Sequence, residues 1–251
     1  MSLAELADRA RSHVRGNGRA VVGVAGPPGA GKTTFVSRLL HVLRATPPGG
    51  LTSDWVAHLP MDGFHLADVE LDRLGIRHRK GAPDTFDADG YLSILQRIKQ
   101  DGPRVVYAPA FERTLEQPVA AAIAVNPSAR LIVTEGNYLL LRTGQWPQIR
   151  ALLDEVWYVD LDEDERTRRL ISRHIEFGKE PHEAAAWVNG PDQANAALVG
   201  STRVDADLVI GPADVTTSES GAGGARPSER SRPLRHAEQG EMPGPGPGAI
   251  K

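Results

Sequence analysis

Short apolar runs rich in β-branched residues recur along the chain, with little polar alternation inside them. Such runs are typical of strands that are buried on both faces of a parallel sheet. We expect strands at Ala20–Ala25, Trp55–Met61, Arg104–Tyr107, Arg130–Thr134, Glu155–Asp160 and Ala206–Ile210. Apolar residues at helical spacing predict helices at Lys32–Arg44, Ala88–Gln100 and Asp164–Phe177. This alternation predicts an α/β fold with a mostly parallel sheet of about five strands, helices on both faces and a helical lid.

The alternating pattern stops near Gly211. From there to Lys251 the chain consists mostly of Gly, Pro, Ser, Arg and Glu, and its acids balance its bases. A segment of this composition buries too little apolar surface to offset the entropy that it would lose on ordering. We therefore expect a folded domain over residues 1–210 and an inert, disordered tail over residues 211–251.

Composition and charge exclude several classes of protein. With 251 residues and a formal net charge of −3, the chain suits one α/β domain and lacks the positive field that attracts nucleic acid. It contains no cysteine, which excludes disulfides and thiolate metal sites and suits a reducing cytoplasm. No segment is apolar over the length needed to span a bilayer. We expect a cytoplasmic protein that acts on a small molecule, with a homodimer left open.

The segment Gly26–Thr33 reads GPPGAGKT and fits the phosphate-binding pattern G-x-x-x-x-G-K-[ST], between a predicted strand and a predicted helix. Its glycines let successive backbone N–H groups face one point, and the helix N-terminus adds partial positive charge. We expect Lys32 to reach the β- and γ-phosphates of ATP and the Thr33 hydroxyl to ligate Mg²⁺. The residues expected to bind the nucleotide are Gly26, Gly29, Ala30, Gly31, Lys32, Thr33 and Thr34.

Two predicted strands end in an acid, at the edge of the sheet where ligands bind in such folds. Asp62 follows the second strand, and we take the phosphate loop to lie on the adjoining strand. Asp62 can then accept a proton from a substrate hydroxyl and help to order Mg²⁺, while Gly63 leaves space for the substrate. Glu135 ends its strand in the manner of a Walker B acid, so we expect it to hold Mg²⁺ through water. A turn-starting or solvent-facing acid is the alternative for each.

Four arginines lie in a short helical stretch after the fifth predicted strand: Arg166, Arg168, Arg169 and Arg173. Guanidinium groups stabilise the charge that spreads over a phosphoryl group during its transfer. A helix that closes over ATP would bring arginines to that group and exclude water. Arg169 and Arg173 are i, i+4 neighbours and the best candidates. The alternative is a solvated helix whose arginines pair with its own acids, Glu163, Asp164 and Glu165.

Some residues between the motifs suggest where a substrate binds. The basic run Arg77–Lys80 favours an anionic substrate if it lines the mouth of the pocket, and a solvated loop face is the alternative. His65 and Glu112 are candidates for contacts with substrate hydroxyls, although a lone histidine is more often structural. Asn137 follows the second acid-bearing strand and is placed to line the same pocket.

Further segments follow in order: Lys80–Asp87 reads KGAPDTFD, Tyr107–Phe111 reads YAPAF, Thr134–Asn137 reads TEGN, and Ser172–His174 reads SRH. With the phosphate loop and Asp62, they resemble the uridine kinase, pantothenate kinase and phosphoribulokinase superfamily, over Val21 to Ile210. The resemblance implies a three-layer, nucleotide-kinase-like P-loop fold that uses ATP and Mg²⁺. It also implies that Asp62 is the catalytic base and that Arg173 stabilises the phosphoryl group. The candidate substrate contacts are then His65, Lys80, Phe111, Arg113 and Asn137.

Three positions depart from the patterns of this superfamily. Arg113 stands where pantothenate kinases carry a histidine, and Leu170 stands where they carry a tyrosine three residues before the lid arginine. Gly81 stands where uridine kinases carry an acid for the ribose hydroxyls. Pantothenate and uridine themselves are therefore disfavoured as acceptors, and a sugar, another nucleoside or a pantothenate-like metabolite stays open.

Three functions compete on this sequence. The first is a kinase that transfers the γ-phosphate of ATP to a hydroxyl of a small metabolite. The second is a regulatory P-loop NTPase that hydrolyses ATP to drive a conformational change, and the third is a nucleotide-binding module without catalysis. The sequence has no guanine-reading N-K-x-D motif, and Asp62 with the arginine-bearing helix favours transfer to an alcohol over hydrolysis. Intact Lys32, Thr33 and Glu135 argue against the third function.

Overall fold

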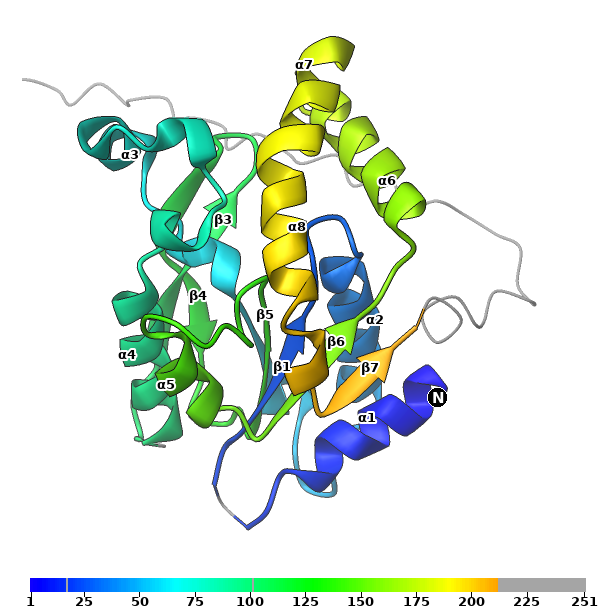
Figure 1. Cartoon of the computed structure of the whole chain (residues 1–251). Helices are drawn as coiled ribbons and strands as arrows, with labels where there is room; N and C mark the ends of the chain where they lie inside the picture. The colour runs from blue at the N-terminus through cyan, green and yellow to red at the C-terminus, as the bar shows by residue number, and fades with distance from the viewer. Residues whose placement is uncertain (17, 101, 212–251) are drawn as a thin grey trace, which may run out of the picture. The chain divides into compact units, whose positions relative to one another are not determined.

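The computed structural model describes residues 1–16, 18–100 and 102–211. Within these residues, five strands form a parallel sheet in the spatial order β2-β5-β1-β6-β7 (Figure 1). They are β1 (Ala20–Ala25), β2 (Val56–Pro60), β5 (Leu131–Glu135), β6 (Glu155–Val159) and β7 (Leu208–Ile210). The α-helices are α1 (Leu3–Ser12), α2 (Lys32–Ala45), α3 (Asp68–Leu74), α4 (Ala88–Lys99), α5 (Trp146–Ala151), α6 (Glu163–Glu176), α7 (Pro181–Trp187) and α8 (Gln193–Gly200). The predicted α/β fold is confirmed, and the predicted tail lies outside the described residues from residue 212 onward.

The sheet buries apolar side chains on both faces, as its uninterrupted apolar runs predict. Along β1, Val21 and Ala25 join a core that includes Leu95 of α4 and Ile149 of α5. The alternate residues of β1 join a second core with α1 and α2. Helices α1 and α2 therefore cover one face and α4 and α5 the other (Figure 1). Two-sided packing holds the strands in place, so the loops at their carboxyl ends start from fixed positions.

The region after α4 corrects one prediction. The sequence predicts a strand over Arg104–Tyr107 in the main sheet, but the structure has a separate antiparallel pair, β3 (Val106–Glu112) and β4 (Gln117–Val125). The prediction missed β4 because its proline and alanines lack the β-branched signal of a strand. The apolar run in β3 indicates neither direction nor partner, so the sequence could not separate this pair from the sheet.

The strand order corrects a second expectation. The sequence argument places Asp62 on the strand adjoining the phosphate loop, but β5 lies between β1 and β2. Glu135, the last residue of β5, pairs in register with Val24 of β1 and with Pro60 of β2. Because the three parallel strands end at one edge, the phosphate loop, Glu135 and Asp62 still share that edge, with Glu135 in the middle.

Helices α6, α7 and α8 follow β6 and form the predicted lid (Figure 1). A π-helical turn, Val188–Asp192, joins α7 to α8 without a break. Arg166 of α6 donates to the side chain of Gln193, and Nε2 of His174 lies 2.9 Å from Oδ2 of Asp192. These contacts hold α6 against the segment that contains α7 and α8. Among the described residues, no helix has both the length and the apolar character needed to cross a membrane.

Candidate active site at the carboxyl edge of the sheet

The phosphate loop, Gly26–Thr33, leaves β1 and enters α2. Gly29 has a φ of +81°, and a Cβ at this position would come within 2.6 Å of the Leu170 side chain on α6. A side chain would be strained by the left-handed backbone and would collide with Leu170, so glycine lets α6 rest directly on the loop. Leu170, one of the departures from the superfamily pattern, therefore packs against the phosphate loop.

Lys32 points back into the phosphate loop. Its ammonium donates to two carbonyl oxygens of the loop, at 2.9 and 3.0 Å, and to Oδ1 of Asn137 at 2.7 Å. Burial lowers the pKa of Lys32 to about 8, although the charges of Glu135 and Asp62 oppose this shift. Lys32 as a whole is half-buried, and its ammonium contacts three neutral oxygens. Because no negative group of the described residues contacts the ammonium directly, an anionic ligand bound there would stabilise its charge. Asn137, predicted to be a substrate contact, lies on the side of the phosphate loop.

Two oxygen donors suited to Mg²⁺ meet where α2 begins. The Thr33 hydroxyl donates to Oε2 of Glu135 at 3.0 Å, so these two predicted metal ligands lie side by side. An oxygen-only pair fits Mg²⁺, which takes few protein ligands and completes its shell with phosphate oxygens and water. The described residues contain no group of three or more His, Cys, Asp or Glu that could hold a metal.

His58, which the sequence argument did not single out, lies beside Glu135. Its Nε2 is 3.4 Å from Oε1 of Glu135, the carboxylate oxygen opposite the one that Thr33 contacts. This nitrogen is buried and, within the described ranges, has no hydrogen-bond partner. A small rotation of either side chain would complete the bond. A histidine inside a strand gives no sequence signal of such a role, because the partner lies on another strand.

Asp62 lies in the 3₁₀ turn Met61–Phe64 that follows β2. Its side chain is 39% exposed, and Nη2 of Arg113 lies 3.5 Å from its Oδ2. A Cβ on Gly63 would lie 2.7 Å from the carbonyl carbon of Pro109 and closer still to the oxygen. The expectation that Gly63 leaves space for the substrate is therefore wrong, because the backbone of β3 fills that space. The same crossing brings Arg113, just beyond β3, to Asp62.

The arginines of α6 have different surroundings. Arg166 is buried and donates to Gln193, so it supports the lid itself. Arg168 and Arg169 both pair with Glu165, at 2.7 and 2.8 Å, as the solvated-helix alternative predicts. Pairing with an acid of the same helix does not remove an arginine from the site, because an exposed pair of this kind is weak and easily exchanged.

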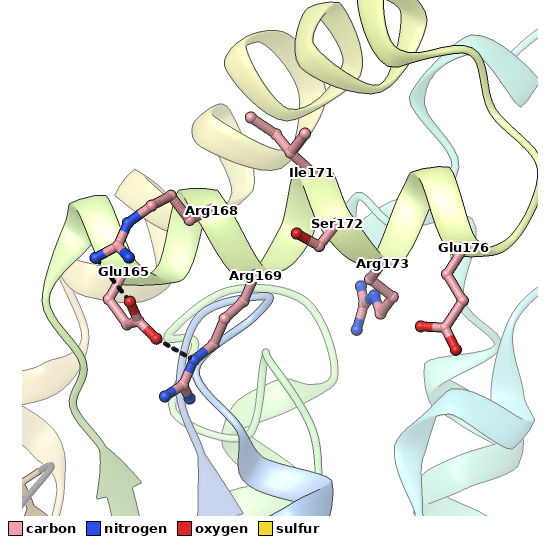
Figure 2. Close-up of a pocket in the computed structure, with 7 residues that line it drawn as sticks. All are labelled: Glu165, Arg168, Arg169, Ile171, Ser172, Arg173 and Glu176. Atoms are coloured by element: carbon pink, nitrogen blue, oxygen red, sulfur yellow. Dashed lines mark hydrogen bonds and ion pairs between the residues drawn. The ribbon is translucent and has the colours of Figure 1, made fainter.

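Arg169 and Arg173 are among the α6 residues that line an open hollow of about 720 Å³ (Figure 2). Nη1 of Arg169 lies 3.6 Å from the place of a Cβ on Gly31, at the start of α2. Burial lowers the pKa of Arg173, and the neighbouring charge of Arg113 lowers it further, while Asp62 opposes the shift. The two arginines proposed from sequence therefore lie over the loop and near the predicted base.

The other predicted substrate contacts gather around Asp62. His65 donates through Nδ1 to the carbonyl oxygen of Asp62 at 2.8 Å, and its ring centroid lies 4.9 Å from that of Phe111. Burial lowers the pKa of His65, so a neutral ring keeps Nε2 as an acceptor. The Lys80 ammonium lies 5.5 Å from the centre of the Phe111 ring but donates to Asp68 at 2.7 Å. The rings of His65 and Phe111 thus form an aromatic wall beside the base.

The lid adds Asp192, which the sequence argument missed. Asp192 is 9% exposed and accepts from Nε2 of His174. Burial raises the pKa of Tyr138, and the charge of Asp192 raises it further. The Tyr138 hydroxyl donates to the carbonyl oxygen of Gly81, the position where uridine kinases carry an acid. The charge of Asp192 therefore acts on a side chain that contacts this turn. This neighbourhood forms only when the lid folds back over the sheet, so no local pattern indicates it.

Comparison with known proteins identifies the family of this chain. Residues 21–210 match the family described as "Phosphoribulokinase / Uridine kinase family". The chain is 34% identical over 212 residues to the Schizosaccharomyces pombe protein named "Putative uridine kinase C227.14", which covers 82% of this chain and 88% of that protein. It is 30% identical over 192 residues to Escherichia coli "Uncharacterized protein YggC", covering 76% of this chain and 77% of that protein.

Two solved structures show the same fold. The crystal structure of a "putative fructose transport system kinase" from Silicibacter sp. TM1040 has a TM-score of 0.75 and 33% identity, covering 84% of this chain and 99% of that one. The structure of YFH7 from Saccharomyces cerevisiae, described as "a putative P-loop containing kinase with a circular permutation", has a TM-score of 0.70, covering 84% of this chain and 98% of that one. At 17% identity it supports the fold alone.

Proposed function

Because this chain belongs to the phosphoribulokinase/uridine kinase family, we propose that it transfers the γ-phosphate of ATP, with Mg²⁺, to a hydroxyl of a small metabolite. The P-loop kinase fold supports nucleotide binding in general. Relatives named for uridine and for fructose transport support an acceptor that resembles a sugar or a nucleoside, and a pantothenate-like acceptor stays open.

The observation that carries the proposal is the place of Asp62. A base for transfer to an alcohol must be near the triphosphate and also accessible to the acceptor. Asp62 is near enough to Lys32 for its charge to raise the lysine pKa against the effect of burial, and 39% of its side chain is exposed. A carboxylate that only started a turn would need neither proximity to Lys32 nor an exposed side chain.

In the proposed reaction, Asp62 takes the proton of the acceptor hydroxyl. The hydroxyl oxygen forms its new bond to the γ-phosphorus as the bond from that phosphorus to the leaving ADP oxygen breaks. Lys32, Arg169 and Arg173 stabilise the charge on the phosphoryl oxygens, and the lid excludes water. Thr33 and Glu135 would hold Mg²⁺, which when bound neutralises charge on the phosphates.

The test measures ADP release over a panel of sugars, nucleosides, vitamins and their phosphates, each compared with a reaction without acceptor. Once an acceptor is found, Asp62→Asn should lower turnover by ~10²–10⁴-fold while ATP binding changes little. Asp89→Asn, an exposed aspartate on α4, is the matched control and should keep wild-type turnover. Near-normal turnover in Asp62→Asn would remove Asp62 from the mechanism.

The regulatory NTPase is the competing function, and the same assay separates the two. A regulatory NTPase releases ADP at a rate that no small hydroxyl compound increases. A kinase shows a background rate that rises when its acceptor is added, with one phosphorylated product formed for each additional ADP. A constant background with tight ATP binding would therefore favour the regulatory function.

A further inference from the structure

The members of the basic run Arg77–Lys80 differ in how far they are exposed. The side chains of Arg77 and Arg79 are 54% and 47% exposed, whereas that of Lys80 is 17% exposed. Both arginines form ion pairs with acids of the same region, namely Asp68, Asp72 and Asp84. The arginines therefore fit the solvated-loop alternative. A lysine as enclosed as Lys80 needs partners inside the protein, and these partners indicate its role.

The Lys80 ammonium joins two segments that are distant in sequence. It donates to Oδ1 of Asp68, the first residue of α3, and to the carbonyl oxygen of Glu116, in both cases at 2.7 Å. Glu116 is the last residue of the turn between β3 and β4. Although burial raises the pKa of Asp68, the hydrogen bond and the charge of Lys80 lower it below its ordinary value, so Asp68 is a carboxylate at neutral pH. Two of the three donors of the ammonium are thus engaged within the protein.

Gln117 joins the same two segments. Its side-chain oxygen accepts from the backbone N–H of Asp68 at 3.0 Å. This N–H lies in the first turn of α3, where a helix has donors without partners of its own, and Ala67 before it supplies no side-chain cap. Glu116 has a φ of +53°, a left-handed conformation that a residue with a side chain rarely adopts, so its surroundings must hold it. The contact of its carbonyl oxygen with Lys80 does so.

The hairpin of β3 and β4 carries two side chains of the candidate site. The Phe111 ring centroid lies 4.9 Å from that of His65, and Nη2 of Arg113 lies 3.5 Å from Oδ2 of Asp62. Among the described residues, the polar contacts that join the hairpin end, residues 113–117, to other elements are this pair and the contacts with α3 and Lys80. A contact of 3.5 Å between partly exposed side chains is weak, so the contacts with α3 and Lys80 largely set where the turn lies.

We propose that Lys80 is a positioning residue, whose ammonium holds the turn between β3 and β4 against the start of α3 and thereby keeps Phe111 and Arg113 beside Asp62. Lys80 then acts on the reaction through these side chains and does not contact the acceptor. This inference rests on the proposed kinase function for its effect on turnover, while the position of the turn can be measured without any acceptor. It reassigns Lys80, which the sequence argument placed among the substrate contacts.

The first experiment follows hydrogen exchange by mass spectrometry in the full chain, with no ligand added. Lys80→Met removes the charge and keeps a side chain of similar length, so residues 112–117 should exchange about 10-fold faster than in wild type, while the main sheet exchanges as before. Arg73→Met is the matched control, because Arg73 is 68% exposed and pairs with Glu70 of its own helix. The control should exchange as wild type. Unchanged exchange of residues 112–117 in Lys80→Met would overturn the inference.

Asp68→Asn separates positioning from direct binding of an anion. The asparagine keeps the backbone N–H that donates to Gln117 but loses the charge that holds the Lys80 ammonium. If Lys80 positions the turn, Asp68→Asn should also speed the exchange of residues 112–117, and adding Lys80→Met should increase the effect little. Arg77→Met removes the other ion pair of Asp68 and should leave this exchange unchanged. If Lys80 bound an anionic acceptor instead, the freed ammonium in Asp68→Asn would lower KM for that anion.

Turnover then tests the consequence for the site. With each compound of the acceptor panel that increases ADP release, Lys80→Met should lower kcat/KM by about 10- to 100-fold, because a shift of about 1 Å in the groups around the base is costly. The loss should be the same for a phosphorylated compound and its neutral counterpart, and the Kd for ATP should keep its wild-type value. Lys80→Arg should restore part of the turnover, because a guanidinium group can also donate to a carboxylate and a carbonyl oxygen.

Three kinetic results would contradict the role of Lys80. A loss in Lys80→Met that is confined to anionic compounds would make Lys80 an acceptor contact, and a lower KM for an anion in Asp68→Asn would do the same. If wild-type protein binds ATP but no compound of the panel increases ADP release, the kinase function fails. The positioning of a base then fails with it, even where hydrogen exchange shows that Lys80 holds the turn in place.

Discussion

A methyl group at Gly63 tests how the base is positioned. In Gly63→Ala the new Cβ would lie 2.7 Å from the carbonyl carbon of Pro109, where an ordinary contact needs roughly 3.5–4.0 Å. Either β3 or the turn that carries Asp62 must then move by about 1 Å. Overpacking of this size costs about 1–3 kcal/mol, which for a domain of this length lowers Tm by roughly 2–10 °C. A 1 Å displacement of the base also lowers kcat by about 10²-fold.

The assay compares Tm and kcat of Gly63→Ala with those of Gly49→Ala, where an added Cβ meets nothing within 4 Å. The control should match wild type in both values. If Gly63 instead leaves space for the substrate, the alanine should raise KM and leave Tm unchanged. That result, or identical behaviour of the two variants, would refute the conclusion that β3 crosses directly over this turn.

The charges around the phosphate loop make three further expectations testable. Arg173→Ala should slow a single turnover by about 10²–10³-fold and weaken ATP binding much less; equal losses would make it a binding contact only. Because the pKa of Lys32 is lowered to about 8, its ammonium loses its proton as pH rises past that value, so the Kd for ATP should increase above pH 8. Lys32→Arg should flatten this dependence, and an unchanged slope would exclude Lys32 as its source. His58→Ala should raise the Mg²⁺ concentration for half-maximal activity by about 10-fold, and an unaltered Mg²⁺ requirement would separate His58 from Glu135.

Local patterns predicted the elements that carry the nucleotide site. The strand Ala20–Ala25 has the observed bounds, and the helix predicted at Lys32–Arg44 ends one residue short of α2. The phosphate loop lies between them, as its motif requires. These features depend on residues that are close in sequence, namely an uninterrupted apolar run, three glycines and the start of a helix. Propensity and hydrophobic period are therefore sufficient to locate them.

The surroundings of Asp62 were less predictable. Its place at the strand edge was expected, but its neighbours come from β3, from the lid and from the strand β5 that lies between β1 and β2. The residues next to Gly63 in the sequence do not indicate that this glycine is needed for the close contact with Pro109. The basic run Arg77–Lys80 likewise does not indicate that acids from other positions pair with it. Each of these facts is a pairing between segments distant in sequence, and a single sequence contains no direct record of such pairings.

The amino-acid sequence thus determined the fold class, the phosphate loop and the two acids at strand ends, because buried strands and glycine turns follow from short-range chemistry. The tertiary structure alone decided which strand lies between them, that Lys32 faces Asn137, and that Arg113, from beyond β3, lies beside the base. The physical reason is that burial and charge at a site depend on every segment packed around it, and chain folding brings those segments together only in three dimensions.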